Sequence, residues 1–137
     1  MAKSFRCTIV TPTEAVLDTE VAYVTFPAWD GQAGVMAGRS PFLSRLGLGP
    51  ARLDFADGGS RWFLVDGGFA QMQDDALSLL TEHAVAAETL NTTDAEREFK
   101  DSLDAKAPAE GRESLERRQA RARAALAMAR AASGRPI

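Results

Sequence analysis

Side chains that carry out catalysis are scarce in this chain. Its 137 residues include one Cys, one His and one Tyr. A lone Cys7 excludes an internal disulfide and favours a reducing compartment. Because Cys7 falls in an alternating strand pattern, we interpret it as a small buried hydrophobe rather than a nucleophile. One His and one Cys cannot form a zinc site of ordinary composition, so we predict no catalytic residue, no metal site and no cofactor.

The signatures of several other protein classes are missing as well. No run approaches the roughly 18 consecutive apolar residues of a membrane-spanning helix. The first ten residues lack the apolar core of a signal peptide. No Gly-x4-Gly-Lys-Ser/Thr phosphate-binding loop is present. The carboxylates of Asp74 and Asp75 are adjacent in an expected turn, where solvated side chains are the rule.

Charge is distributed unevenly along the chain. Residues 1–111 carry 9 Lys and Arg against 17 Asp and Glu, a net charge of −8. Residues 112–137 carry 7 Arg against 2 Glu, a net charge of +5. An acidic body with a basic tail favours contact between that tail and an acidic surface, a nucleic acid or a membrane.

The first 86 residues have the pattern of short strands separated by turns. Alternating or β-branched apolar runs predict strands over 5–11, 15–18, 21–26, 51–56, 61–66, 69–73 and 77–82. The turn Asp57–Ser60 predicts a hairpin between two of these runs. We therefore expect an all-β N-terminal domain over residues 1–87, a flattened sandwich or barrel of about ten short strands.

The segment Gly31–Pro50 has an unusual composition. It holds five of the eleven glycines and two of the six prolines, but no His, Cys, Asp, Glu, Lys or Tyr. We expect it to be a connection between strands. Glycine permits positive φ and close approach of a partner to the main chain, and loops on rigid scaffolds often make contacts. A contact surface and a long connection with tight turns both fit this composition.

Helical periodicity replaces the strand pattern from Leu90 onward. We expect Thr92 or Thr93 to cap a first helix, with Glu96 completing a capping box. One face of this helix is predicted to carry Ala95, Phe99 and Leu103. Pro108 and Gly111 are expected to end it, because proline cannot continue a helix and glycine resets the turn.

A second helix is predicted over about 112–132. Its residues at alternating steps of four and three form a narrow seam for another helix: Leu115, Gln119, Ala122, Leu126, Ala129 and Ser133. Residues 88–137 should therefore form an antiparallel helical hairpin. Its seam contains few large side chains, so the hairpin should be marginally stable by itself. Such packing fits an arm that docks and undocks, or a terminal hairpin packed permanently on its own domain.

The order of these motifs resembles a known family. The pattern Gly31-x-x-Gly34-Val35-x-x-Gly38-x-x-Pro41-Phe42-Leu43 is similar to the glycine-proline signature of epsilon subunits of F-type ATP synthases. The segments FRCTIVTPTEAVLD, Gly67-Gly68-Phe69 and LSLLTE resemble the first hairpin, the strand junction and the last sandwich strand of that family. The sequence departs from the signature at Gln32-Ala33, Ala37 and Arg39-Ser40.

The resemblance implies a non-catalytic rotor subunit in the central stalk of a proton-translocating ATP synthase. The sandwich would hold the gamma subunit and rest on the c-ring. Residues 31–39 would form the ring-facing loop, with contacts from Gly31, Gln32, Gly34, Gly38, Arg39 and Pro41. The subunit would be peripheral, on the cytoplasmic face of the bacterial inner membrane, and would meet the membrane only through the complex.

The same resemblance implies that the hairpin is a regulatory arm. When extended, its basic helix would reach acidic segments of the alpha and beta subunits and inhibit ATP hydrolysis, through Arg117, Arg118, Arg121 and Arg123. Some members bind ATP in the hairpin as a regulatory ligand. Here Asp94 and Arg97 keep the spacing of that motif, but its flanking positions differ.

Two other functions fit parts of the sequence. A ligand-binding protein or enzyme could be built on the sandwich, with His83 as its polar centre. A nucleic-acid-binding module could use the four arginines of the terminal helix. That helix has no interleaved aromatic residue to stack on bases, and the body of the chain is acidic.

Overall fold

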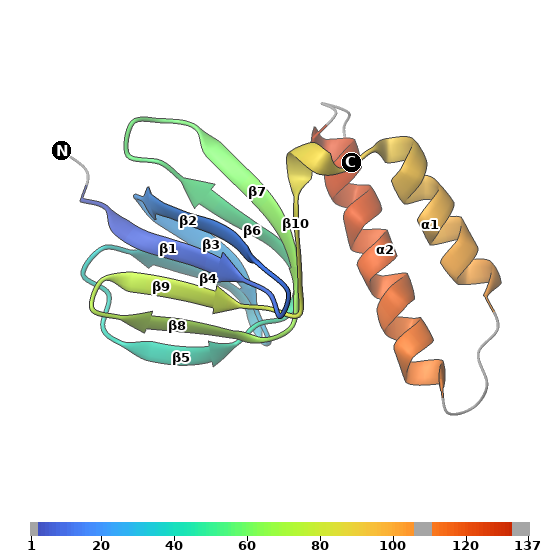
Figure 1. The fold of residues 1–137 in the computed structure, drawn as a ribbon, viewed down its shortest axis with the longest axis horizontal. Helices are drawn as coiled ribbons and strands as arrows, with labels where there is room; N and C mark the ends of the chain where they lie inside the picture. The colour runs from blue at the N-terminus through green and yellow to red at the C-terminus, as the bar shows by residue number, and fades with distance from the viewer. Residues whose placement is uncertain (1–2, 106–110, 133–137) are drawn as a thin grey trace. The chain divides into compact units, whose positions relative to one another are not determined.

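The chain is described here from a computed structural model that covers residues 3–105 and 111–132. It divides into two compact units, Met1–Ala86 and Ala87–Ile137. The described part of the first unit is built from strands and that of the second from helices (Figure 1). The expected fold class, a β-sandwich followed by a helical hairpin, is therefore confirmed.

The first unit contains two five-stranded sheets (Figure 1). One sheet has the order β2-β1-β9-β8-β5, with bounds β1 Phe5–Val10, β2 Ala15–Val21, β5 Phe42–Arg45, β8 Phe69–Gln73 and β9 Ala76–Leu80. The other has the order β10-β7-β6-β3-β4, with bounds β3 Tyr23–Ala28, β4 Gly31–Met36, β6 Leu48–Asp54, β7 Ser60–Asp66 and β10 His83–Ala86. The expected hairpin of residues 51–66 is present as β6 and β7.

The core lies between the two sheets, where alternate residues of each strand point inward. In β1 these residues are Phe5, Cys7 and Ile9, all almost fully buried. The same cluster includes Phe26 of β3 and Phe63 of β7. Burial of alternate residues on both inner faces is what gives these short sequences their strand periodicity.

The connections β5–β6, β7–β8 and β9–β10 lie together at one end of the sandwich, and each crosses from one sheet to the other. There Gly67 and Gly68 join β7 to β8, both with positive φ, 73° and 96°. A Cβ on Gly68 would overlap the carbonyl oxygen of Leu80, so both the conformation and the space require glycine. The N–H of Asp66 donates to the Thr81 hydroxyl at 3.3 Å, which links the β7–β8 and β9–β10 connections.

The glycine-rich segment contradicts the expectation of one long connection. Residues Gly31–Met36 form β4, an edge strand paired antiparallel with β3 along its whole length. β5 and the start of β6 also lie within Gly31–Pro50. The expected single loop over residues 31–39 is therefore wrong. Hydrogen bonding to β3 outweighs the low strand propensity of glycine.

The second unit contains η1 (Ala87–Thr89), α1 (Thr92–Asp104) and α2 (Arg112–Ala132). The two α-helices pack side by side as an antiparallel hairpin (Figure 1). Ala95 of α1 and Leu126 and Ala129 of α2 form its small apolar cluster, with Leu90 and Phe99 against it. The bounds of α2 agree with the predicted second helix.

Two details of the predicted hairpin are wrong. Asn91 caps α1: its side-chain oxygen accepts from the N–H groups of Thr93 and Asp94 at 2.8 and 3.2 Å. Threonine was expected in that role, but asparagine is an equally good cap one residue earlier.

The seam of α1 also differs from the prediction. Leu103 is 53% exposed, and Ser102 occupies the buried seam position instead. The expected seam residue Ser133 and the helix-ending Pro108 lie outside the described residues.

Candidate partner-binding site

The six residues expected to contact a partner lie along β4 and just beyond it. Gly31 and Gln32 begin the strand next to the β3–β4 turn, whereas Gly38, Arg39 and Pro41 follow its other end. At about 3.3 Å per residue, the two groups are about 20 Å apart. The structure thus divides the expected surface into two clusters.

Gly34 lies between these clusters on the exposed face of β4. It is directly opposite Thr25, and the Tyr23 side chain lies over it so closely that a Cβ would collide with the Tyr23 hydroxyl. An aromatic ring covering a glycine on the neighbouring strand protects main chain that would otherwise be bare. A side chain at position 34 would have to displace the Tyr23 ring, so the absence of a Cβ there allows this packing.

The loop Ala37–Pro41 joins β4 to β5 and is held at several points. The Gly38 N–H donates to Asp75 Oδ1 at 2.9 Å, and the Arg39 N–H donates to the Met36 carbonyl at 3.3 Å. The Arg39 guanidinium lies 5.3 Å from the centre of the Phe42 ring. These contacts give an exposed loop a defined shape.

The other cluster lies beside the β3–β4 turn. Trp29 is 70% exposed there, the most exposed of the large hydrophobic side chains in the described residues. The main-chain N–H of Trp29 donates to the Arg45 carbonyl at 3.1 Å. The main chain of the turn is therefore fixed, although the Trp29 indole ring faces solvent. Trp29 was not predicted as a contact residue. Its position directly before Asp30-Gly31 was the available signal, because aromatic side chains on exposed turns often mark contact surfaces.

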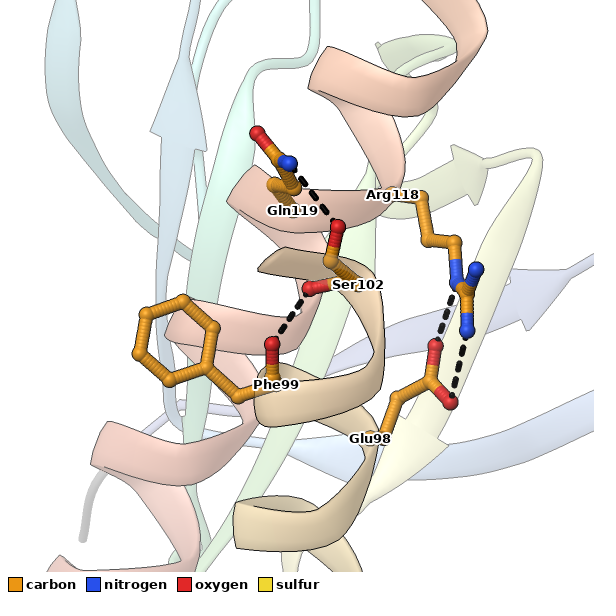
Figure 2. Close-up of polar contacts among 5 residues, drawn as sticks. All are labelled: Glu98, Phe99, Ser102, Arg118 and Gln119. Atoms are coloured by element: carbon orange, nitrogen blue, oxygen red, sulfur yellow. Dashed lines mark hydrogen bonds and ion pairs between the residues drawn. The ribbon is translucent and has the colours of Figure 1, made fainter. Parts of the chain in front are cut away.

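The four arginines of the terminal helix occupy different environments. Arg118 makes a two-point ion pair with Glu98 of α1, with Nε–Oε1 2.7 Å and a second hydrogen bond of 3.3 Å to Oε2 (Figure 2). The Arg123 guanidinium lies 5.6 Å from the centre of the Phe99 ring. Arg117 is exposed and Arg121 is half-buried. At least two of the four side chains are thus engaged inside the hairpin.

A second polar contact lies beside the ion pair. Gln119 Nε2 donates to the Ser102 carbonyl at 2.9 Å, and the Ser102 hydroxyl donates to the Phe99 carbonyl at 2.7 Å (Figure 2). The Ser102 carbonyl is in the last turn of α1, where no further helix N–H is available to satisfy it. Gln119 therefore caps the end of α1 from the neighbouring helix.

The ion pair shifts the ionisation of both partners. The hydrogen bond from Arg118 holds the pKa of Glu98 below its usual value, and Arg121 adds a smaller effect of the same sign. The hydrogen bond to Glu98 correspondingly raises the pKa of Arg118. Both side chains are partly exposed to solvent, so salt and competing charges weaken the pair. Glu98 was missed in the sequence because it flanks the apolar face rather than lying on it.

Asp94 and Arg97, the residues at the spacing of the ATP motif, are both exposed in the first two turns of α1. The Asp94 N–H is bound to the capping Asn91 side chain. Nucleotide binding by these two residues stays a prediction.

The His83 alternative receives no support from its surroundings. His83 begins β10 with an exposed side chain, and its carbonyl lies 3.0 Å from the Thr81 hydroxyl. Within residues 3–105 and 111–132, no group of three or more His, Cys, Asp and Glu residues is arranged to hold a metal. Cys7 is fully buried, and loss of hydration raises the pKa of its thiol to about 12, which makes it a poor nucleophile. None of the described helices is long and apolar enough to cross a bilayer.

Comparison with known proteins identifies similar chains over most of this length. A family model described as the β-sandwich domain of the ATP synthase delta/epsilon chain matches residues 4–87. An ATP synthase epsilon chain of Rhodopirellula baltica is 43% identical over 101 residues, 74% of this chain and 78% of the relative. An epsilon chain of Nitratidesulfovibrio vulgaris strain DP4 is 35% identical over 130 residues, 95% of each chain.

Solved structures share the fold. A chain of the mitochondrial ATP synthase of Euglena gracilis superposes with a TM-score of 0.69 at 20% identity, over 96% of this chain and 80% of that chain. A chain in the central stalk and ring of the Tetrahymena thermophila mitochondrial ATP synthase gives a TM-score of 0.67 at 15% identity, over 93% and 97% of the two chains. At these identities the likeness concerns the fold alone.

Proposed function

Because the chain belongs to the delta/epsilon-chain family of ATP synthases, we propose that it is a non-catalytic subunit of the central stalk of a proton-translocating F-type enzyme. The observation that carries this proposal is the family match over residues 4–87 together with relatives that extend through the hairpin. The scarcity of His, Cys and Tyr is consistent with a subunit that performs no chemistry of its own.

The sandwich is the assembly unit in this proposal. It contacts the gamma subunit and the c-ring, and the two ends of β4 provide two of the contact points. The β3–β4 turn and the start of β4 offer the exposed ring of Trp29, and the loop Ala37–Pro41 offers Arg39 and main chain around Gly38. Both are fixed by hydrogen bonds to the sandwich, which supports a role in contacts that need little reordering on binding.

The helical hairpin is the regulatory unit. Its basic helix contacts acidic segments of the alpha and beta subunits through Arg117, Arg118, Arg121 and Arg123, and so restrains ATP hydrolysis. The small apolar cluster and the exposed ion pairs of the hairpin support this role, because contacts of both kinds are exchanged at low cost. The subunit is peripheral, on the cytoplasmic face of a bacterial inner membrane, and is joined to the membrane through the complex.

Affinity purification of the full-length chain from solubilised membranes tests the stalk role. Gamma, alpha, beta and ring subunits should be recovered with it in constant ratio. Recovery of the chain without gamma and the catalytic subunits would overturn the proposal.

Truncation after residue 89 tests the regulatory role separately. The truncated chain should still assemble, and ATP hydrolysis should rise relative to the full-length complex. Replacing the four arginines by glutamine should reproduce most of that rise, because charge provides the contact. An unchanged rate after truncation would refute inhibition by the hairpin and leave the stalk role intact.

A further inference from the structure

We propose that Asp75 is a positioning residue that holds the loop Ala37–Pro41 in the shape its partner binds. The inference rests on the proposed function, since it assumes that this loop contacts a neighbouring stalk subunit. Asp75 itself need not touch the partner. Its carboxylate acts through the main chain of Gly38.

The turn that carries Asp75 is tight and anchored. Gln73 is paired with Ala76, so Asp74 and Asp75 form the two-residue loop between β8 and β9. Both have positive φ, 53° and 55°, the conformation such a hairpin requires. The Arg6 N–H donates to the Asp75 carbonyl at 3.1 Å, which ties the turn to β1. The carboxylate therefore projects from a fixed main chain.

On the receiving side, the Asp75 carboxylate holds the main chain of Gly38 in the middle of the loop. Gly38 has a φ of 86°, and a Cβ placed on it would meet nothing within 4 Å. Its N–H to Asp75 Oδ1, at 2.9 Å, is the contact that ties this residue to the opposite sheet. The open space over Gly38 is room in which a partner's main chain can approach.

The position of the contact makes it a link between the two sheets. The loop leaves β4, an edge of one sheet, and enters β5, an edge of the other, while Asp75 lies in the β8–β9 turn. Phe42, directly after the loop, stacks on Phe26 in the core with ring centres 6.3 Å apart. The loop is thus fixed at its end by the core and at its middle by Asp75.

An exposed hydrogen bond of this kind contributes little to global stability, because water competes for both groups. It still restricts the local conformations of the loop. The turn accepts aspartate, but Asn–Gly would satisfy it at least as well, so turn geometry alone does not require a carboxylate at position 75. Loop positioning does explain it.

Three full-length variants separate these roles. D75G keeps the positive φ and removes the acceptor. D75N keeps the positive φ and the acceptor, because Asn tolerates positive φ and its side-chain oxygen can accept from the Gly38 N–H. D74G makes the same glycine replacement at the neighbouring turn residue, which makes no described contact with the loop, and is the matched control.

Hydrogen exchange of the Gly38 amide, followed by NMR, is the first readout. D75G should lose about tenfold of the protection of this amide, while D75N and D74G stay close to wild type. Binding to ATP synthase complexes prepared from a strain that lacks this subunit is the second readout. D75G should bind about threefold to tenfold more weakly, through lost preorganisation.

The combination of the two readouts decides the proposal. Lost protection in D75G with unchanged binding would overturn it, and so would equal loss in D74G or failure of D75N to restore binding. A wild-type chain that does not bind the depleted complexes would overturn the proposed function, and the inference with it. In that case the difference in Gly38 protection would still be seen, which distinguishes the two failures.

Discussion

The sandwich and the hairpin differ in the kind of contact that stabilises each of them internally. In the sandwich, large side chains such as Phe5, Phe26 and Phe63 are almost completely removed from solvent. In the hairpin, the apolar cluster consists of two alanines and Leu126, with Leu90 and Phe99 partly buried against it. Polar contacts also cross the hairpin, among them the ion pairs Glu98–Arg118 and Glu96–Arg130.

This difference has a physical consequence for what each unit can do. Burial of large apolar side chains is strong, is not screened by salt and is lost only on unfolding. Exposed ion pairs are weak, screened by salt and replaceable by the charges of another molecule. The sandwich is therefore suited to a permanent contact, and the hairpin to one that changes.

The largest expected effect comes from the sandwich core. Phe26→Ala should lower the free energy of unfolding by about 3–5 kcal/mol, because a fully buried ring leaves a cavity. Both tryptophans lie in the sandwich, so tryptophan fluorescence during urea unfolding measures this unit. Leu43→Ala, at a 69% exposed position in β5, is the control and should change stability by less than about 0.5 kcal/mol. Equal effects of the two would contradict the assigned core.

The next largest effect on stability is expected at Gly68, in the β7–β8 connection that crosses between the sheets. Gly68→Ala should destabilise the sandwich by about 2–4 kcal/mol, since positive φ and contact with the Leu80 carbonyl act together. Gly58→Ala has a similar φ, 99°, but open space around it, and should cost only about 1–2 kcal/mol. Urea unfolding of both variants measures the difference. If G58A were as unstable as G68A, the contact between a Cβ at position 68 and the Leu80 carbonyl would not contribute to the loss.

A smaller effect is expected in the hairpin. Leu126→Ala should destabilise the helices by about 2 kcal/mol, at the low end for buried leucine because the narrow seam can close. Leu103→Ala should be nearly neutral, since that side chain is exposed. Helical circular dichroism during thermal unfolding would measure both, and fluorescence of the sandwich should be unaffected. If Leu103→Ala were more destabilising than Leu126→Ala, Leu103 would lie in the helix interface, as the periodicity of the sequence predicted.

The smallest effect concerns the ion pair. Because Arg118 lowers the folded-state pKa of Glu98, the pair stabilises the hairpin above the ordinary pKa of the carboxyl, near 4.5. That contribution is lost as the pH falls through the lowered value. A double-mutant cycle of Glu98→Gln and Arg118→Gln should give a coupling that is favourable near pH 7, weaker in salt and absent at about pH 2. A coupling that persists in acid would contradict the pairing.

Much of the fold follows from local patterns in the sequence. Cys7 and Ile9 alternate with polar residues in β1, and the bounds of α2 follow from its period and its flanking breakers. The parallel pairing of β1 with β9 does not follow, because its partners, such as Cys7 and Leu77, are distant in the chain. β4 was missed because its strand conformation depends on pairing with β3 and on the cover that Tyr23 provides for Gly34.

The candidate site was predictable in part. The family pattern identified the residues around β4, but a motif gives order along the chain and not separation in space. The extended conformation of β4 is what places Gly31 and Gly38 at opposite ends. Asp75 was interpreted as a solvated turn residue, since nothing local in the sequence relates it to Gly38, 37 positions away.

Native-state hydrogen exchange on the full-length chain tests the contrast between the two units most directly. Amides in the central strands β1, β7 and β9 should exchange only through global unfolding of the sandwich. Amides in α1 and α2 should exchange through an opening that is easier by at least about 2 kcal/mol, and high salt should lower that opening energy further. Equal opening free energies in strands and helices, with no effect of salt on the helices, would contradict the account.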